Sequence, residues 1–128
     1  MGLCKNWCEK YGNYGYLVFR LLFGLLFFMH GYAKFAGGMP AGLMLVAGVV
    51  EVVVGAAVFL GFFTRLGAVL GAIQMLVAFF MVHVPQGWNP LANGGELALL
   101  FFAGFLAMTA YGNGAWSLET VALQKETF

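Results

Sequence analysis

Four apolar runs, separated by short breaks, dominate this 128-residue chain. We expect them to form helices at residues 16–36, 41–63, 66–84 and 94–111, because about 20 apolar residues cross the hydrocarbon core of a bilayer. Only 9% of the residues are charged and 62% are hydrophobic, whereas soluble domains carry roughly 25% charged residues. The sequence therefore predicts an integral membrane protein with a single domain.

The breaks between the runs consist of turn-forming residues. The second run is preceded by A-G-G-M-P, which places Pro40 in the first turn of a helix. A two-residue hairpin at 64–65 follows that run, and Pro85 ends the third run. Short loops make consecutive helices antiparallel neighbours. We therefore predict an all-α, antiparallel four-helix bundle, with a juxtamembrane segment at 1–15 and a polar tail at 112–128 that holds one short amphipathic helix.

Basic residues near the ends of the runs set the expected orientation. Only Lys34 belongs to one side of the membrane, and five basic residues belong to the side with both termini: Lys5, Lys10, Arg20, Arg65 and Lys125. The positive-inside rule then predicts that both termini face the cytoplasm. We expect the protein to lie in the plasma membrane.

Two cysteines, Cys4 and Cys8, lie in the expected juxtamembrane segment. In the cytoplasm they should be ordinary reduced thiols. Because they share one face of a helix, metal or thiol chemistry stays open as an alternative, as does acylation. A net charge of +1 provides no basic patch for nucleic acid, which is therefore excluded as a partner.

Polar side chains inside the apolar runs are the candidate site residues. A charge within the bilayer is costly unless it faces protein or water, so these residues should contact one another or a ligand. They are Arg20, His30, Lys34, Glu51, Gln74, His83 and Glu96.

Depth along the helices, at about 1.5 Å per residue, sorts these residues into two expected layers. An inner layer holds Arg20, Glu51 and Gln74. An outer layer holds Lys34, His30 and Glu96 at the opposite end of the runs. His83 has the same depth as the outer layer but falls about 180° from Gln74 on an ideal helix, which leaves a loop, a second protomer or the headgroup region as its neighbour.

Small residues share the faces of several of these polar groups. Gly48 and Gly55 lie near the Glu51 face, and Glu96 shares a stripe with Ala103, Ala107 and Ala110. Because small residues allow helices to approach closely, we expect the polar groups to lie on packing faces.

Each layer has a structural and a functional interpretation. An Arg20–Glu51 pair can simply hold two helices in register, and the sequence favours neither interpretation. The outer layer favours function, since two histidines and a carboxylate are more than packing requires. A metal site is not favoured, because the spacing of His30 and Lys34 supplies only one good ligand.

Several motifs together resemble the DoxX family of small membrane proteins. They cover about residues 14–119 and include R-L-L-F-G-L-L-F-F-M-H-G-Y-A-K-F, E-x-x-x-G at Glu51, L-G-F-F-T-R, H-V-P-Q-G-W, N-G-G-E and G-N-G-A-W-S-L-E. Glu119 ends the last motif where the family often has Asp. The resemblance implies a four-helix membrane bundle and a connection with redox biology. Members of the family include a subunit of a thiosulfate:quinone oxidoreductase, and the family has no single reaction.

The main functional hypothesis is a redox-linked accessory subunit that binds quinone or another apolar ligand between its helices. His30 and Lys34 would hold a ligand carbonyl, with Arg20, Gln74 and His83 as further ligand-binding candidates. Glu51 and Glu96 are the candidate catalytic residues, as proton carriers.

Electrons would have to come from a partner protein, because the sequence contains no ligand set for haem or an iron–sulfur cluster. At most, the chain would be a subunit of an oxidoreductase. Two alternatives remain: a non-catalytic membrane scaffold, and a small proton-coupled transporter. The small-residue faces also leave a homodimer open.

Overall fold

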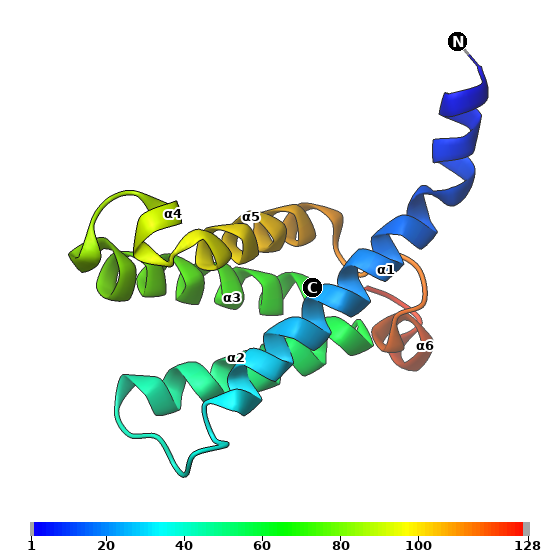
Figure 1. The fold of residues 1–128 in the computed structure, drawn as a ribbon. Helices are drawn as coiled ribbons and strands as arrows, with labels where there is room; N and C mark the ends of the chain where they lie inside the picture. The colour runs from blue at the N-terminus through cyan, green and yellow to red at the C-terminus, as the bar shows by residue number, and fades with distance from the viewer. Residues whose placement is uncertain (1, 127–128) are drawn as a thin grey trace.

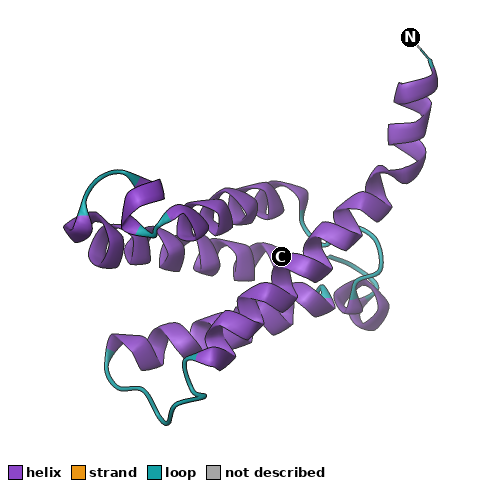
Figure 2. Cartoon of the chain, viewed as in Figure 1, coloured by secondary structure: helices purple, strands orange, loops and turns teal. Residues whose placement is uncertain are grey.

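The computed structural model describes residues 2–126, which are helical with connecting loops and contain no strand (Figure 2). Four longer helices are α1 (Leu3–Ala33), α2 (Leu43–Leu60), α3 (Thr64–Ala78) and α5 (Glu96–Tyr111). The shorter elements are a π-helical turn at Phe79–His83, a 3₁₀ turn at Val84–Gln86, α4 (Pro90–Asn93) and α6 (Leu118–Leu123).

Three helical stretches are long and apolar enough to cross a membrane: Leu3–Ala33, Leu43–Leu60 and Thr64–Gln86. The last of these is α3 together with its π and 3₁₀ continuation. Helix α5 is also apolar, but its 16 residues make it shorter than these three. The structure thus confirms an all-helical protein of membrane-spanning composition.

Two helix boundaries differ from the expected ones, the end of α2 and the start of α1. Helix α2 ends at Leu60 and not at residue 63, because Gly61 has the left-handed conformation, with φ +68°, that terminates helices. Helix α1 begins at Leu3, so the expected juxtamembrane segment is a continuous extension of the first helix.

The helices are arranged as two pairs (Figure 1). Helix α1 packs along α2, and α3 packs along α5. The pairs are joined by a less extensive contact between α2 and α3 and by aromatic side chains between α1 and α5. The N-terminal turns of α1 project beyond the rest of the fold (Figure 1). The arrangement is therefore less evenly packed than the simple up-down bundle that short loops suggest.

Glycines bring α1 and α2 into close contact, as the sequence predicts. A Cβ atom on Gly24 would lie 2.5 Å from the backbone nitrogen of Phe59, and one on Gly31 would lie 2.7 Å from that of Val52. On the α2 side, Gly55 meets the α1 backbone in the same way, at 2.4 Å from the Phe28 nitrogen, whereas Gly48 packs against the Phe35 side chain just after α1. Only glycine fits where two helix backbones approach this closely. This close contact fixes the axial offset of α2 against α1.

Aromatic rings fill the space between the two pairs. Phe27 of α1 contacts Phe101 and Phe105 of α5, with ring centroids 5.2 and 4.8 Å apart. All three rings are buried. Most large apolar side chains outside this core are exposed, as expected for a surface that faces lipid.

Candidate functional site

Three helices meet at the carboxylate of Glu51. Lys34, at the C-terminal end of α1, forms an ion pair with Glu51 Oε2. From α3, Gln74 Nε2 donates to Glu51 Oε1 at 2.7 Å and to the Ala47 carbonyl at 3.3 Å. Glu51 is only 4% exposed. We call Lys34, Glu51 and Gln74 the Glu51 cluster.

The Glu51–Gln74 contact was predicted, but the cation that meets Glu51 is Lys34, and the predicted Arg20–Glu51 pair is wrong. Gly31 packs against Glu51, so the carboxylate lies level with the C-terminal turns of α1. Arg20 is eleven residues before Gly31, about 16 Å away along the helix axis. The depth estimate failed because it centred the first span at residues 16–36, whereas glycine contacts set the actual offset.

The Glu51 cluster reaches the surface of the fold at Lys34. The side chain of Lys34 is 22% exposed, compared with 5% for Glu51. Among residues 2–126, Gln74 Oε1 is buried without a hydrogen-bond partner. Since Lys34 Nζ has three N–H donors, it can serve Glu51 and a further acceptor together.

His30 lies one helical turn before Lys34, so the two side chains are neighbours on α1. His30 is exposed, and its ring meets the edge of Phe101 at a centroid distance of 5.8 Å. His30 and Lys34 therefore lie side by side at the end of α1, as the sequence predicts.

The expected approach of Glu96 to Lys34 is wrong. Glu96 is exposed at the first turn of α5, and within the described part of the chain it forms no ion pair. A carboxylate at this position is favoured by the positive end of the helix dipole. Its stripe of Ala103, Ala107 and Ala110 is exposed as well, because the opposite face of α5, with Phe105, packs on α3.

His83 contacts the segment that links α3 to α5. Its Nδ1 lies 3.1 Å from the carbonyl oxygen of Asn93, whose side chain also bonds Gly87 and Gly95. The expected 180° separation of His83 from Gln74 assumes a regular α-helix. The π-helical turn at Phe79–His83 holds an extra residue, so His83 is rotated around the helix axis from the position that a regular helix would give it. A loop was one of the three predicted neighbours of His83.

Arg20 belongs to a second buried polar group, near the middle of α1 and about four helical turns before Lys34. Its guanidinium donates to the carbonyl oxygens of Asn113, Ala115 at 3.0 Å and Trp116 at 2.7 Å. Arg20 is 1% exposed. It therefore holds the segment after α5 against α1.

The carboxylate of Glu119 completes this group. Asn113 Nδ2 and the Phe63 backbone N–H donate to Glu119 Oε2 at 2.7 and 3.1 Å, and Thr64 Oγ1 donates to Asn113 Oδ1. We call Arg20, Thr64, Asn113 and Glu119 the Arg20 cluster.

Sequence reasoning missed three members of the Arg20 cluster. All three are at most 1% exposed, although the sequence predicts a hairpin at Thr64 and a polar tail that contains Asn113 and Glu119. The available signal was Arg20 itself, because a buried guanidinium needs several acceptors.

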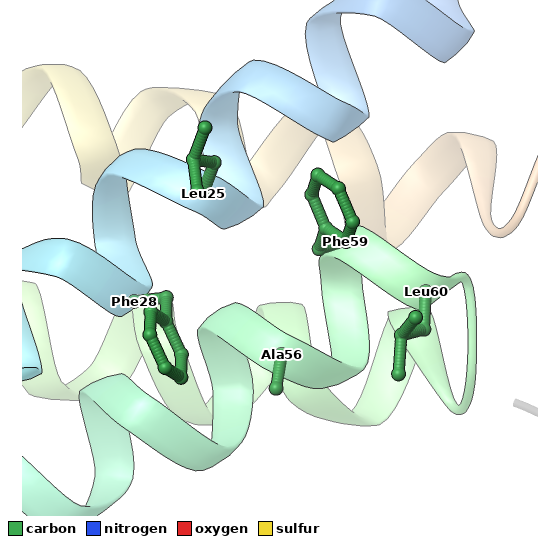
Figure 3. Close-up of a pocket in the computed structure, with 5 residues that line it drawn as sticks. All are labelled: Leu25, Phe28, Ala56, Phe59 and Leu60. Carbon is green, nitrogen blue, oxygen red and sulfur yellow. The ribbon is translucent and has the colours of Figure 1, made fainter.

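An apolar groove of about 270 Å³ lies between α1 and α2 (Figure 3). Its lining residues are Leu25, Phe28, Ala56, Phe59 and Leu60. At 100° per residue, Leu25 and Lys34 fall about 180° apart around α1, so the groove and the Glu51 cluster lie on different sides of that helix. Its apolar lining suits a hydrocarbon chain and offers nothing to a polar ligand.

The apolar helices and the polar clusters at their contacts define a small helical integral membrane protein. Residues 15–84 match the family model of DoxX, and the chain belongs to the DoxX family.

Three relatives are similar over most of the chain. A Haemophilus influenzae protein without an assigned function is 37% identical over 94% of this chain and 99% of its own length. The Bacillus subtilis protein CatD, named provisionally as an oxidoreductase, is 33% identical over 67% of this chain and 72% of its own. The Escherichia coli inner membrane protein YqjF is 28% identical over 91% and 98%. No solved structure matches the chain.

Proposed function

We propose that this protein is a redox-linked accessory subunit that binds a quinone, or another apolar ligand with a carbonyl, beside the Glu51 cluster. The observation that carries the proposal is that this cluster reaches the surface at Lys34, which is 22% exposed next to a carboxylate that is 5% exposed. A buried acid with a donor at its entrance suits ligands that gain or lose protons.

Each residue near Lys34 has a definite part in the proposal. Lys34 Nζ and the His30 ring donate hydrogen bonds to a ligand carbonyl. When the ligand is a quinol that is being oxidised, the Lys34 ammonium passes a proton to the ionised Glu51 Oε2, and the resulting amine takes up the proton of the quinol hydroxyl. Gln74 orients the Glu51 carboxylate. Glu96 exchanges protons with water at the membrane surface, and Arg20 and His83, which have partners within the chain, position α1 and the segment that links α3 to α5.

Electrons enter from a partner protein in this proposal. The name of the relative CatD, provisionally an oxidoreductase, supports a redox setting. We further propose that α5 is a fourth span and that both termini face the cytoplasm of a plasma-membrane protein. The inner membrane relative YqjF supports that location. The Glu51 cluster then lies toward the outer face of the membrane.

Ligand binding can be tested with the protein in lipid nanodiscs, titrated with a short-chain ubiquinone in a calorimeter. We expect saturable binding that Lys34→Met weakens at least about tenfold, since a hydrogen bond to a charged donor contributes about 1.5–3 kcal/mol. Lys125→Met, at an exposed lysine, is the matched control and should bind like wild type. Absent binding, or equal binding by the two variants, would overturn the proposal.

A non-catalytic scaffold is the second candidate. It is favoured by the internal hydrogen bonds that already occupy both oxygens of Glu51. Glu51→Gln separates the two candidates. A scaffold variant would keep complex formation and activity while its thermal stability falls, whereas a redox subunit would remain folded and lose activity.

A further inference from the structure

The first turns of α1, residues 3–12, form an exposed helical segment with two chemically distinct sides. We call this segment the N-terminal extension. At 100° per residue, one side of about 140° holds five uncharged residues: Leu3, Cys4, Trp7, Cys8 and Tyr11. The rest of the circumference holds the charged residues and the asparagine of the segment: Lys5, Asn6, Glu9 and Lys10. The N-terminal extension is therefore an amphipathic helix, and its apolar side is exposed.

The hydrocarbon core of a bilayer cannot account for this apolar side. Residues 13–33 of α1 are about 31 Å long, which already spans a core of about 30 Å. The charges of Lys5, Glu9 and Lys10 agree with this boundary, because a charge inside hydrocarbon is costly. Contact with lipid chains thus explains the exposed apolar residues of the span but not those of the N-terminal extension.

Helix α1 changes direction where the N-terminal extension joins the span. In Figure 1, the darkest blue turns run across the direction of α3 and α5 and lead away from the rest of the fold. Gly12 and Gly15 lie close to this junction, and a Cβ atom on either would meet nothing within 4 Å, so packing requires neither glycine. Glycine pairs are a recognised cause of bends in helices. Because α3 and its continuation are long and apolar enough to cross a membrane, a segment that runs across α3 lies along the membrane surface.

The apolar side of the N-terminal extension continues the side of the span that faces lipid. Trp7 and Tyr11 fall within about 60° of Val18, Leu22 and Met29 around α1, and the last three are each 55% exposed. This side points away from the fold, and α1 bends away from the fold as well (Figure 1). It is therefore the inner side of the bend, which turns toward the bilayer.

We propose that the N-terminal extension is an interfacial helix that lies in the headgroup region of the bilayer beside its own span. Trp7 and Tyr11 point into the membrane, at the level that aromatic residues with a polar group prefer, and Lys5 and Glu9 point to water. The bilayer is the occupant that the chain itself favours, because it already covers the same side of α1 directly after the bend. The inference is independent of the proposed ligand site, since Lys34 lies at the other end of α1.

Quenching of tryptophan fluorescence in proteoliposomes tests this position. Trp88→Phe and Trp116→Phe, both at exposed positions, leave Trp7 as the only tryptophan of the chain. Lipids brominated in the upper part of their acyl chains should quench Trp7 about twice as strongly as lipids brominated near the chain ends, because the ring lies at headgroup level. Iodide in the water should quench Trp7 weakly.

The matched control moves the fluorophore to the polar side of the N-terminal extension. In the same background, Trp7→Phe is combined with Asn6→Trp. Iodide should quench this protein at least about threefold more strongly than the Trp7 protein, and brominated lipids should quench it less. Equal quenching of the two proteins would overturn the proposal. A Trp7 ring that neither iodide nor brominated lipid reaches would overturn it too, since a second copy or another protein would then cover the apolar side.

The thiols provide a second measurement that leaves every tryptophan in place. With Cys4→Ser, the remaining thiol of Cys8 lies on the apolar side. In opened native membranes it should react with a charged maleimide at least about tenfold more slowly than the thiol of Asn6→Cys in a background of Cys4→Ser and Cys8→Ser, because a charged reagent is excluded from the membrane side of an interfacial helix. Equal rates would show that the N-terminal extension projects into water.

Discussion

The two buried polar groups lie about four helical turns apart along α1 and differ in how completely the chain surrounds them. In the Arg20 cluster, every side chain is at most 1% exposed and the guanidinium is bound by three backbone carbonyls. In the Glu51 cluster, the carboxylate is buried but its cation is partly exposed. Each cluster has a buried atom without a hydrogen-bond partner within residues 2–126, Gln74 Oε1 in one and Arg20 Nε in the other, so the two clusters differ in exposure and not in unpaired atoms.

The difference indicates what each group can do. A cation enclosed by fixed carbonyls cannot exchange its partners without unfolding the segment that carries them. Removing one member of such a group leaves several buried polar atoms unpaired, which is strongly destabilising. A lysine at the surface of the fold can turn between its carboxylate and a ligand. We therefore assign stability to the Arg20 cluster and ligand exchange to the Glu51 cluster.

The largest effect should come from Arg20→Met. This change leaves the carbonyl oxygens of Asn113, Ala115 and Trp116 without their donor, and we expect a loss of about 3–5 kcal/mol, enough to prevent accumulation of folded protein. Thermal unfolding in detergent checks this. Arg65→Met, at an exposed arginine 3.6 Å from Glu126, should be nearly silent. Similar melting temperatures for both variants would contradict the difference between the clusters.

The next effect should come from Lys34→Met, which leaves Glu51 buried without a cation. We expect a loss of about 3 kcal/mol, of which a substantial part is recovered when Glu51→Gln is added, because the unpaired charge then disappears. Unfolding free energies of the two single variants and the double variant measure this coupling. Additive losses would mean that the Lys34–Glu51 ion pair contributes little.

A smaller effect is expected for Thr64→Val in the Arg20 cluster. The substitution keeps the shape of the side chain but removes the donor to Asn113 Oδ1, so about 1–2 kcal/mol should be lost without any change in ligand binding. Chemical denaturation and the ubiquinone titration measure the two quantities. Weakened ubiquinone binding in a folded Thr64→Val protein would show that the clusters are coupled.

The smallest effect on stability should be that of His30→Phe. His30 is exposed and makes only a ring contact with Phe101 among the described residues, so the stability should change by less than about 0.5 kcal/mol. In contrast, ubiquinone binding should weaken about fivefold with the loss of one hydrogen bond of about 1 kcal/mol. Unchanged binding would remove His30 from the proposed site.

The sequence by itself determined the class of protein and the kinds of residue that must be buried. The apolar runs required membrane-spanning helices, and ionisable residues within them required partners, as Arg20 and Glu51 show. Gly48 and Gly55 also indicated that the Glu51 side of the second helix is a packing face, where Gly55 meets the backbone of α1. These inferences depend on periodicity and on the cost of burial, which are local properties of the chain.

Only the tertiary structure decided which partner each polar residue has. The axial offset between α1 and α2 is set by Gly31 against Val52, and it places Lys34, and not Arg20, at Glu51. The return of the chain after α5 brings Asn113 and Glu119 to Arg20 and Thr64. Neither the offset between helices nor the path of a loop is encoded in hydrophobic periodicity, because both result from close contacts between residues far apart in the sequence.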